Sequence, residues 1–320
     1  MQVIENCTPD EIQKAAKALV DGKLVAFPTE TVYGLGADAT NQSAIARIYS
    51  VKARPVNHPL IVHISSINQA EKWATDISEY ALDLARHFWP GPITLILKRS
   101  GLALDAVTGG QDSVGLRVPS NPVALNLLAE FEKLGGSGVA APSANRFGSV
   151  SPTSAKAVEA ELGFFMEEGD LILDDGQCLI GIESTIVDCT QAAPIVLRPG
   201  AVTTEMIDKA TGLRNTFNLD GPRVRVSGQM ASHYSPKAVV EFGIPTERGH
   251  GFIALAGFAT PFGTIRLAAP KSSEEYAKVL YQALRRGDEL GLERIFVIEP
   301  QGNGLAVAIR DRLKKAVSGK

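Results

Sequence analysis

Four short segments of this 320-residue chain combine hydroxyl groups, cations and glycine or proline in a way that suits a small phosphorylated ligand. They span residues 28–36, 52–55, 141–153 and 181–188. Short hydroxyl and amide side chains donate hydrogen bonds to phosphate oxygens without adding charge. Lys52 supplies a point charge and Arg54 a planar fork of donors, which are complementary means of holding a polyphosphate. Each segment alone is more often a turn, a helix cap or a solvated pair of charges, so only the set favours nucleotide chemistry.

These segments can act together if strands bring them to one edge of a sheet, where open α/β sheets bind ligands. Apolar runs predict strands at residues 24–27, 60–64, 93–97, 114–118, 138–141, 171–173, 185–188 and 195–197. Helical spacing and caps predict helices near residues 9–21, 43–51, 78–88, 122–133, 154–162 and 203–210. Because crossover links and hairpin-length links both occur, the predicted fold class is α/β, a twisted mixed sheet with helices on its faces.

The chain changes character after residue 210. Residues 211–237 contain several glycines and prolines with little periodicity, which predicts a linker. Strands at 252–256 and 294–299 and helices at 273–286 and 305–315 then predict a smaller, Rossmann-like α/β domain. No GxGxxG motif follows its first strand, so no dinucleotide site is assigned to it. The predicted parts are a catalytic domain at 1–205, a linker at 206–237 and a C-terminal domain at 238–320.

Charge is divided unevenly between these parts. Residues 1–205 hold 15 Lys and Arg against 24 Asp and Glu, whereas residues 206–320 hold 17 against 11. An acidic first part repels polyanions, so a nucleotide there must be held by a few focused cations. The basic second part could face RNA or complement the acidic part, and the second is favoured because no basic stripe interleaved with aromatic residues is present.

Composition excludes several classes of protein. No apolar run approaches the roughly 18 residues that a membrane span needs, and the N-terminus has no signal-peptide pattern, which together predict a cytoplasmic protein. The three cysteines are too few and too scattered for a disulfide framework. The five histidines lack the spacing of metal ligands, so we expect no metal site built from protein side chains.

In this order and spacing the motifs resemble the threonylcarbamoyl-adenylate synthase family, the YrdC-like proteins, in its two-domain form. The motifs are PTETVYGLG, KARPVNHPLIVHI, WPGPITLIL, SVGLRVP, APSANRFGSVSPT, GIESTIVD, LRPG and SGQMASHYSPK. They cover nearly all of residues 10–240, and the C-terminal domain matches by position and predicted type rather than by motif. The resemblance implies a YrdC-like sheet in the first domain.

The resemblance also implies which residues surround the substrates. A tetrad around ATP and its metal is formed by Lys52, Arg54, Ser143 and Asn145. The amino acid is enclosed by Thr31, His63, Arg117, Ala141 and Ser184. The nucleotide is contacted by Arg54, His58, Ser113, Ser143, Ser151, Arg198 and Tyr234. Three positions depart from the commoner pattern, in which Gly stands at Ala53, Asn at His58 and Thr at Ser113.

The implied activity is that of an L-threonylcarbamoyladenylate synthase, a nucleotidyltransferase. It condenses L-threonine, bicarbonate and ATP to threonylcarbamoyl-AMP and pyrophosphate, for N6-threonylcarbamoyladenosine formation in tRNA. Mg²⁺ is expected as cofactor, held mainly by the ATP phosphates, because cages of protein ligands are uncommon for this ion. The product is handed to a threonylcarbamoyl transferase acting on tRNA, and we expect weak or no direct RNA binding.

Two other functions stay open at this point. An RNA-binding accessory module of tRNA modification would use the basic second part of the chain, although the acidic first part counts against it. A carbamoyl-adenylate former that uses carbamoyl phosphate is the other, but the acylphosphatase-like and zinc-finger segments expected beside it are absent from this sequence.

Residues 227–237 end in a dense cluster of His233, Tyr234, Pro236 and Lys237. A plain tether does not need such a cluster, although glycine-rich and proline-rich stretches often are tethers. We therefore predict that this segment folds back as a lid, with Tyr234 on the nucleotide, and that it keeps water from a hydrolysable adenylate. The C-terminal domain would anchor the lid, and a chain ending near Thr204 is expected to fold without either.

Overall fold

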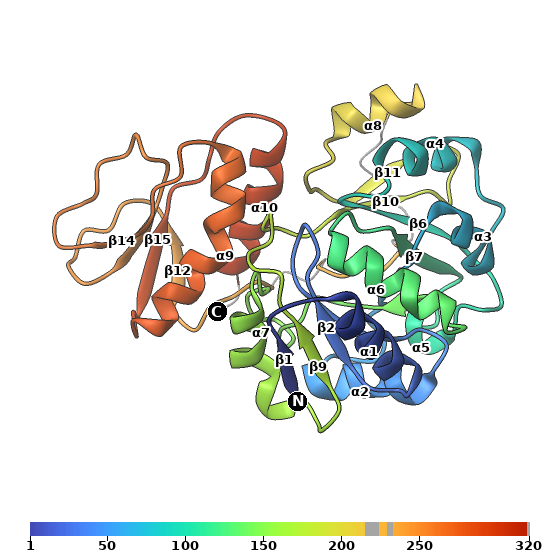
Figure 1. Cartoon of the computed structure of the whole chain (residues 1–320). Coiled ribbons are helices and arrows are strands. Elements are labelled where there is room, and N and C mark those ends of the chain that lie inside the picture. The colour runs from blue at the N-terminus through green and yellow to red at the C-terminus, as the bar shows by residue number, and fades with distance from the viewer. Residues whose placement is uncertain (215–223, 229–232, 319–320) are drawn as a thin grey trace.

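The computed structural model describes residues 1–214, 224–228 and 233–318, which form a larger and a smaller α/β unit (Figure 1). The larger unit is built on an 11-stranded mixed sheet in the order β1-β9-β2-β3-β8-β4-β7-β6-β10-β11, with β5 beside β6. Its strands are β1 (Gln2–Ile4), β2 (Val25–Phe27), β3 (Gly34–Asp38), β4 (Ile61–His63), β5 (Ala74–Thr75), β6 (Ile93–Arg99), β7 (Ser113–Arg117), β8 (Val139–Ala140), β9 (Leu171–Leu173), β10 (Thr185–Asp188) and β11 (Ile195–Arg198).

Helices cover this sheet. They are α1 (Pro9–Val20), α2 (Gln42–Lys52), α3 (Ala70–Trp73), α4 (Glu79–Phe88), α5 (Asp105–Thr108), α6 (Pro122–Lys133), α7 (Ala155–Leu162) and α8 (Thr204–Thr211), with 3₁₀ turns at Ile67–Gln69 and Gly163–Phe165. The helix α1 begins as predicted, because Thr8 accepts a hydrogen bond from the Glu11 amide and Pro9 occupies the first helical position. Its buried face of Ile12, Ala15, Ala16 and Leu19 packs in one core with α6.

The strand β3 was not predicted from the sequence, in which residues 28–36 were interpreted as a segment suited to a ligand or a turn. Residues 34–38 instead pair antiparallel with β2 and β8. A Cβ on Gly36 would lie 2.8 Å from atoms of both Phe27 and Val139. Gly36 therefore lets the side chains of the neighbouring strands pack closely. It is required for this packing and not for ligand binding.

The smaller unit is a four-stranded, all-parallel sheet in the order β12-β15-β13-β14. Its elements are β12 (Val239–Phe242), β13 (Gly251–Ile253), β14 (Ile265–Ala268), α9 (Ser273–Glu289), β15 (Arg294–Val297) and α10 (Leu305–Val317). Both helices lie on the side of this sheet that faces the larger unit (Figure 1). The predicted fold class is confirmed, although the sequence analysis missed β12 and β14.

The two units share apolar packing. Val32, Val150 and Ile182 of the larger unit belong to the same buried cluster as Leu280 and Ile309 of the smaller one. At Gly181 a Cβ would lie 2.5 Å from the Cα of Lys278 in α9, so the chain preceding β10 runs directly against that helix. The smaller unit is therefore packed onto the segment that leads into the predicted site.

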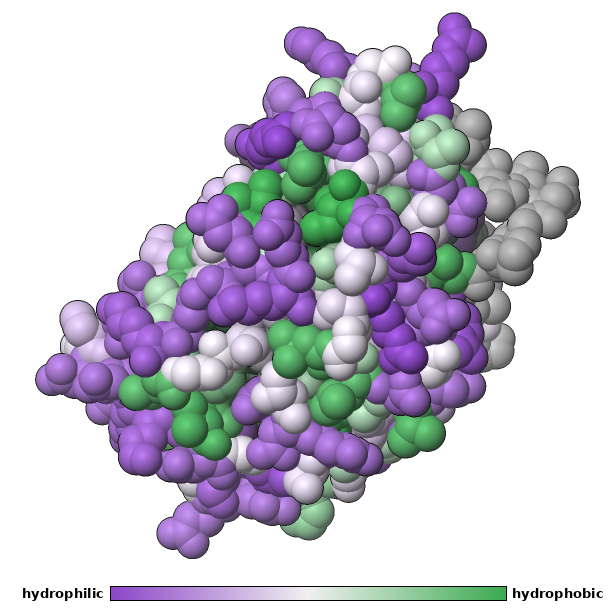
Figure 2. Space-filling model, turned by 90° about the vertical axis from the view of Figure 1, so that its right-hand side faces the viewer, coloured by the Kyte–Doolittle hydropathy of each residue, from purple (hydrophilic) through white to green (hydrophobic). Residues whose placement is uncertain are grey.

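On the face of the larger unit shown in Figure 2, hydrophobic residues form small patches between polar ones, as on most globular proteins. None of the helices in the described part of the chain is long and apolar enough to span a membrane. The cysteines Cys7, Cys178 and Cys189 are free thiols.

Candidate active site

A small cavity of about 50 Å³ lies among the strand ends of the large sheet and the residues that precede β12. Nine of the predicted site residues line it, and these are Thr31, Arg54, His63, Arg117, Ala141, Ser143, Ser184, Arg198 and Tyr234. Ser227, Gly228 and His233 line it from the linker. Because pockets for drug-sized ligands enclose about 300–1,000 Å³, some of these residues must move before ATP can enter.

Lys52 ends α2 and lies buried behind the cavity. Its Nζ donates hydrogen bonds to the backbone oxygens of Ser143 and Asn145, which ties α2 to the segment after β8. Burial, and then the neighbouring Arg54 charge, lower the pKa of Lys52 well below its ordinary value. Ala53 follows in a left-handed conformation, with φ 49° and ψ 41°, and turns the chain toward Arg54.

Arg54 and Arg198 both contact Ser227 of the linker. Arg54 Nη2 donates to Ser227 Oγ at 3.0 Å and to Pro59 O at 2.9 Å. Arg198 Nη1 donates to Ser227 O at 3.1 Å, and its Nη2 donates to Ser184 Oγ at 3.1 Å. Burial lowers the pKa of Arg54 to about 10, which still leaves it charged at neutral pH. In these contacts neutral oxygens hold both cations, so their charges are available to an anion.

Arg117, at the end of β7, has an anionic partner that the sequence analysis did not identify. Its Nη2 lies 2.7 Å from Glu30 Oε1, and both side chains are buried. The other carboxylate oxygen of Glu30 accepts a hydrogen bond from the Ser120 amide at 3.1 Å. The signal was present, because a cation on a buried strand end requires an anion nearby.

His63, at the end of β4, is held neutral. Burial, and then the Arg117 charge, lower the pKa of His63 to about 3. The ring packs edge to face on Phe27, with centroids 5.9 Å apart. A neutral imidazole beside a cation can position a substrate by hydrogen bonding without adding charge to the cavity.

Two pairs of hydroxyl groups face this region. Thr29 Oγ1 and Thr31 Oγ1 lie 2.8 Å apart, and Thr94 Oγ1 and Ser184 Oγ lie 2.8 Å apart. Thr94 lies on β6 and was not predicted as a site residue, since it lies in an apolar run far along the chain from Ser184. Within each pair the two hydroxyl groups fix each other's orientation, and their remaining lone pairs can accept hydrogen bonds from a polar ligand.

Asn145 offers an oxygen ligand. Its Nδ2 donates to the backbone oxygens of Arg146 and Ser149 at 2.7 and 2.8 Å, whereas its buried Oδ1 has no hydrogen-bond partner among the described residues. An amide oxygen of this kind fits a hard cation such as Mg²⁺. Across the described residues, no group of three or more His, Cys, Asp or Glu side chains is placed to hold a metal ion.

Ser151, predicted as a nucleotide contact, lies behind the cavity wall. Its Oγ donates to Glu183 Oε1 at 2.6 Å, and its only hydroxyl hydrogen is thereby engaged. Ser151 cannot keep this bond and also donate its hydroxyl to a phosphate. Glu183 lines the cavity and is a further residue that the sequence analysis did not assign.

His58 and Ser113 lie outside the cavity lining. Ser113 lines a separate recess that residues 224–227 of the linker cover. Gln111 holds that segment, because its side-chain amide donates to Arg225 O at 3.0 Å and accepts from Arg225 N at 2.7 Å. The ring of His58 packs edge-on against Phe147, with centroids 5.2 Å apart. Contact of Ser113 with a nucleotide therefore requires the linker to shift.

Tyr234 is buried in the cavity wall. It has a positive φ of 62°, which is unusual for a tyrosine. Its ring stacks on Tyr281 of α9 with centroids 5.7 Å apart and planes 24° apart. Its hydroxyl has no hydrogen-bond partner among the residues that the structure describes. The predicted lid residue is thus held from the side of the smaller unit, while residues 229–232 of the lid segment lie outside the described residues.

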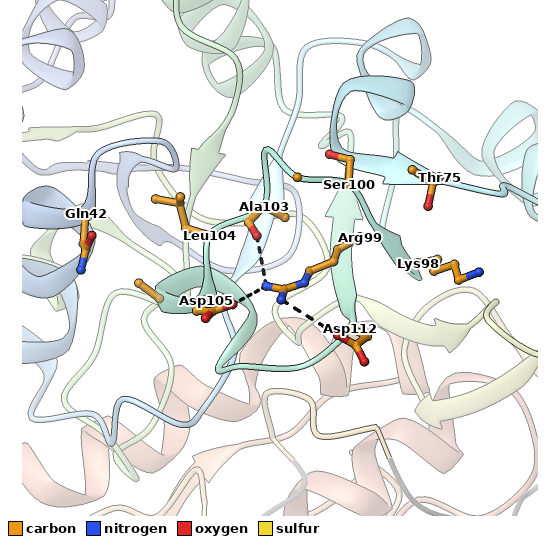
Figure 3. Close-up of a pocket in the computed structure, with 11 residues that line it drawn as sticks. Gln42, Thr75, Lys98, Arg99, Ser100, Ala103, Leu104, Asp105 and Asp112 are labelled. Atoms are coloured by element: carbon orange, nitrogen blue, oxygen red, sulfur yellow. Dashed lines mark hydrogen bonds and ion pairs between the residues drawn. The ribbon is translucent and has the colours of Figure 1, made fainter.

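A larger and more open pocket, of about 720 Å³, lies at the edge of the sheet between β6 and α5 (Figure 3). Its polar groups satisfy one another. Arg99 Nη1 donates to Ala103 O at 3.3 Å and to Asp105 Oδ1 at 2.5 Å, and Asp112 lies 4.0 Å away (Figure 3). We assign it no chemistry, because its cations Lys98 and Arg99 are both paired with carboxylates and none of the predicted site residues lines it.

Two family models match the chain. One, described as "Telomere recombination" and covering Sua5, YciO and YrdC proteins, matches residues 17–200. The other, described as "Threonylcarbamoyl-AMP synthase, C-terminal domain", matches residues 202–318. The chain belongs to the threonylcarbamoyl-AMP synthase family.

Members of this family are similar to the chain over nearly its whole length. The threonylcarbamoyl-AMP synthase of Pyrococcus abyssi is 38% identical over 96% of this chain and 94% of its own. That of Bacillus subtilis is 36% identical over 97% of this chain and 94% of its own. A crystal structure of P. abyssi Sua5 complexed with L-threonine superposes with a TM-score of 0.87 at 36% identity, covering 100% of this chain and 97% of that one. The family, fold class and enzyme class predicted from the motifs are confirmed.

Proposed function

We propose that this chain condenses L-threonine, bicarbonate and ATP to L-threonylcarbamoyl-AMP and pyrophosphate, by the residues described above. The observation that carries the proposal is the set of buried cations, Lys52, Arg54, Arg117 and Arg198, around one cavity. Relatives named for this product match the chain over both units. L-threonine is the ligand in the P. abyssi Sua5 complex, which supports the choice of amino acid.

The reaction needs two bond-forming steps. The threonine amine combines with bicarbonate to give a carbamate and water. A carbamate oxygen then bonds to the α-phosphorus of ATP while the bond from that phosphorus to the bridging oxygen breaks, and pyrophosphate leaves. No covalent enzyme intermediate is required, so the protein contributes positioning and charge stabilisation. Arg54 and Arg198 would exchange Ser227 for phosphate oxygens when ATP binds.

Threonine would be held at the opposite group of side chains. Arg117 retains N–H donors beyond those engaged by Glu30 and Gly91, and these can meet the threonine carboxylate. Thr31 and Ser184 carry hydroxyls that can bond the threonine side-chain hydroxyl. The neutral His63 adds hydrogen-bonding capacity without a second charge.

Mg²⁺ would accompany ATP. The buried Oδ1 of Asn145 is the protein atom that fits it, and the remaining ligands would be phosphate oxygens and water. When bound, the ion offsets phosphate charge during displacement of pyrophosphate. Lys52 would keep Ser143 and Asn145 in place through its two backbone contacts.

The linker would act as a lid over the product. Ser227, Gly228, His233 and Tyr234 already line the cavity, and an adenylate hydrolyses if water reaches it. The lid would open to admit ATP and close again during turnover. The product would then pass, in the cytoplasm, to a threonylcarbamoyl transferase acting on tRNA.

Mass spectrometry tests the proposal directly. Purified chain is incubated with ATP, Mg²⁺, L-threonine and carbon-13 bicarbonate, and the product is analysed at once. We expect threonylcarbamoyl-AMP carrying the heavy carbon, together with stoichiometric pyrophosphate. Pyrophosphate without incorporated carbon, or no reaction with threonine, would overturn the proposed function.

A further inference from the structure

Arg312 of α10 is a buried cation that reaches out of the smaller unit. Its side chain is fully buried, and Nε donates to Glu183 Oε2 at 3.0 Å. Among the described residues of the smaller unit, 238–318, it is the only charged side chain that is fully buried. Burial of a charge is costly unless it is paired and hydrogen-bonded, so the placement of Arg312 needs an explanation.

The other donors of Arg312 meet Asp311 of the same helix, at 2.7 Å, and the backbone beside two predicted site residues. Nη1 donates to Pro199 O at 2.8 Å, and Nη2 lies 3.4 Å from Glu183 O. Glu183 directly precedes Ser184, and Pro199 directly follows Arg198. One guanidinium therefore fixes the start of β10 and the end of β11 at the positions from which Ser184 and Arg198 enter the cavity.

Glu183 extends the contact to a third site residue. Its carboxylate accepts from Ser151 Oγ at 2.6 Å and from Tyr281 OH at 2.9 Å, so it joins α9, α10 and the Ser151 segment. Burial alone would raise its pKa, but the Arg312 and Arg198 charges and these hydrogen bonds hold the pKa of Glu183 at about 2. The carboxylate is therefore ionised and fully engaged at neutral pH, and it is not available as a catalytic base.

Tyr234 completes the group. The guanidinium of Arg312 lies 5.5 Å from the centroid of the Tyr234 ring, and the ring of Tyr281 stacks on it with centroids 5.7 Å apart. Arg312 thus contacts Tyr234 directly, Ser151 through Glu183, and the backbone oxygen of Pro199 next to Arg198. Arg198 and Tyr234 line the cavity, whereas the hydroxyl of Ser151, the third residue predicted to contact the nucleotide, is engaged by Glu183. The three residues come from three separate segments of the chain.

We propose that Arg312 is a positioning residue for ATP, through which the smaller unit sets the geometry of Ser151, Arg198 and Tyr234. The inference rests on the proposed function for the identity of the nucleotide. A purely structural ion pair between the units would be expected to hold surfaces together, as Arg285 and Glu161 do at 3.1 Å. Arg312 also pairs with Asp311 of its own helix, and its remaining hydrogen bonds are with Glu183 and Pro199, which stand next to Ser184 and Arg198.

Isothermal titration calorimetry with ATP and Mg²⁺, in the absence of threonine and bicarbonate, tests this on the full chain. Arg312→Met should weaken ATP binding by roughly ten- to a hundredfold, since displacements near 1 Å in a site have effects of that order. It should also lower the melting temperature, because Glu183 is left unpaired. Arg312→Lys keeps the charge without the fork of donors and should restore stability more fully than affinity.

The double variant Glu183→Gln/Arg312→Met separates positioning from stability. It removes the unpaired charge, so the melting temperature should recover toward that of the wild type. ATP affinity should stay at least about tenfold weaker, because the oxygens of residues 183 and 199 still lack their donor. In steady-state assays the same variants should raise the KM for ATP more than they lower kcat.

Arg285→Met is the comparison variant. It removes the ion pair with Glu161 and the contact with Val150 O beside Ser151, but it leaves the contacts of Arg312 with Glu183, Pro199 and Tyr234 in place. We expect a lower melting temperature with ATP affinity within about threefold of wild type, as for a partly exposed pair. ATP affinity at the wild-type level in the double variant, or equal losses in Arg285→Met and Arg312→Met, would overturn the inference. A wild-type chain that binds ATP but forms no threonylcarbamoyl-AMP would refute the proposed function and leave this binding test valid.

Discussion

The larger and smaller units bury charge in different ways. The larger unit gathers Lys52, Arg54, Arg117 and Arg198 around one cavity, and neutral oxygens hold Arg54 and Arg198 there. In the described residues of the smaller unit the single fully buried charge, Arg312, is paired with Glu183 of the larger unit and with Asp311 of its own helix. Cations held by neutral groups can receive an anionic ligand, and so can Arg117, which pairs with Glu30 but keeps further N–H donors. The donors of Arg312 are engaged by Glu183, Pro199 and Asp311, so that charge serves structure. The difference separates binding groups from positioning groups.

The largest expected effect is that of Arg54→Ala, which tests whether the cations of the larger unit that neutral oxygens hold bind the anionic substrate. We expect pyrophosphate release to fall at least about a thousandfold with the fold intact. A charge-assisted hydrogen bond is worth roughly 1.5–3 kcal/mol in binding, and removal of a donor that stabilises a transition state costs about 10²–10³ in rate. A coupled pyrophosphate assay, with circular dichroism to check folding, measures it.

Arg99→Ala is the matched control for Arg54→Ala. Arg99 also donates to a backbone oxygen inside a pocket, but its charge is paired with Asp105 (Figure 3). Turnover should stay within about twofold of wild type, because a partly exposed ion pair contributes only about 0–1 kcal/mol. If Arg54→Ala is well folded and turns over at the wild-type rate, Arg54 does not bind the substrate. The proposed difference between cations held by neutral groups and cations paired with carboxylates would then be wrong.

The choice among threonine, valine and serine as substrates tests the role of the two hydroxyl pairs. Valine should be used more than about a hundredfold less well than threonine, because the buried hydroxyls at Thr31 and Ser184 would lose a partner. Serine lacks only a methyl group, which is worth about 1–3 kcal/mol. Competition assays that score the two adenylates by mass give the ratio of kcat/KM values. Equal kcat/KM values for valine and threonine would show that these hydroxyls do not bind the hydroxyl group of the threonine side chain.

Stability should depend on pH through the buried histidines near the cavity. Burial lowers the pKa of both His63 and His233 to about 3. The unfolded chain therefore binds more protons than the folded chain below pH 6.5, so stability is full above that pH and declines as the pH falls toward 3. The slope should approach about 2.7 kcal/mol per pH unit for two such groups.

Urea unfolding at pH 7, 6 and 5 measures this dependence. His233→Gln should roughly halve the slope, because one of the two groups is removed. Glu183 contributes in the same direction but only at lower pH, since its stabilisation is lost between about 4.5 and 2. Identical urea midpoints at pH 7 and 5 would show that these histidines are not held neutral in the fold.

The smallest effect concerns Ala53, where the chain departs from the glycine common in the family. A left-handed conformation costs a non-glycine residue roughly 1–2 kcal/mol. The greater freedom of glycine in the unfolded chain offsets up to about 1 kcal/mol of that. Ala53→Gly should therefore raise the free energy of unfolding by less than about 1 kcal/mol. Ala18→Gly, inside α1, should lower it by about 1 kcal/mol, and a change of the same sign in both would refute the strain argument.

Local patterns were sufficient for most of the larger sheet. The apolar runs at β2, β6, β9 and β10 predicted the bounds of those strands within about two residues, because a buried strand is a short run of apolar residues. The strand β3 was missed, since Gly34–Asp38 contains no β-branched residue and its glycines are typical of turns. Edge strand β14 was missed because its residues are exposed or only partly buried, which weakens the apolar signal.

In the site, residue types were predictable and partners were not. The cations were identified because a motif fixes their spacing within a short segment. Their partners Glu30 and Glu183 are distant in sequence from Arg117 and Arg312, and only the three-dimensional packing pairs them. The role expected for the Ser151 hydroxyl changes for the same reason, since its hydrogen is engaged by Glu183.

The apolar cluster shared by the two units has a consequence for how the chain folds. Val150 and Ile182 complete the core under α9, so neither unit buries its full apolar surface without the other. Two bodies joined in this way melt together when their interface contributes a large share of the stability of the weaker one. A single calorimetric transition is therefore expected, and a chain ending near Thr204 should be aggregation-prone rather than the folded fragment that its sequence suggested. On a ribosome, the catalytic part would reach its final form only once α9 and α10 have emerged.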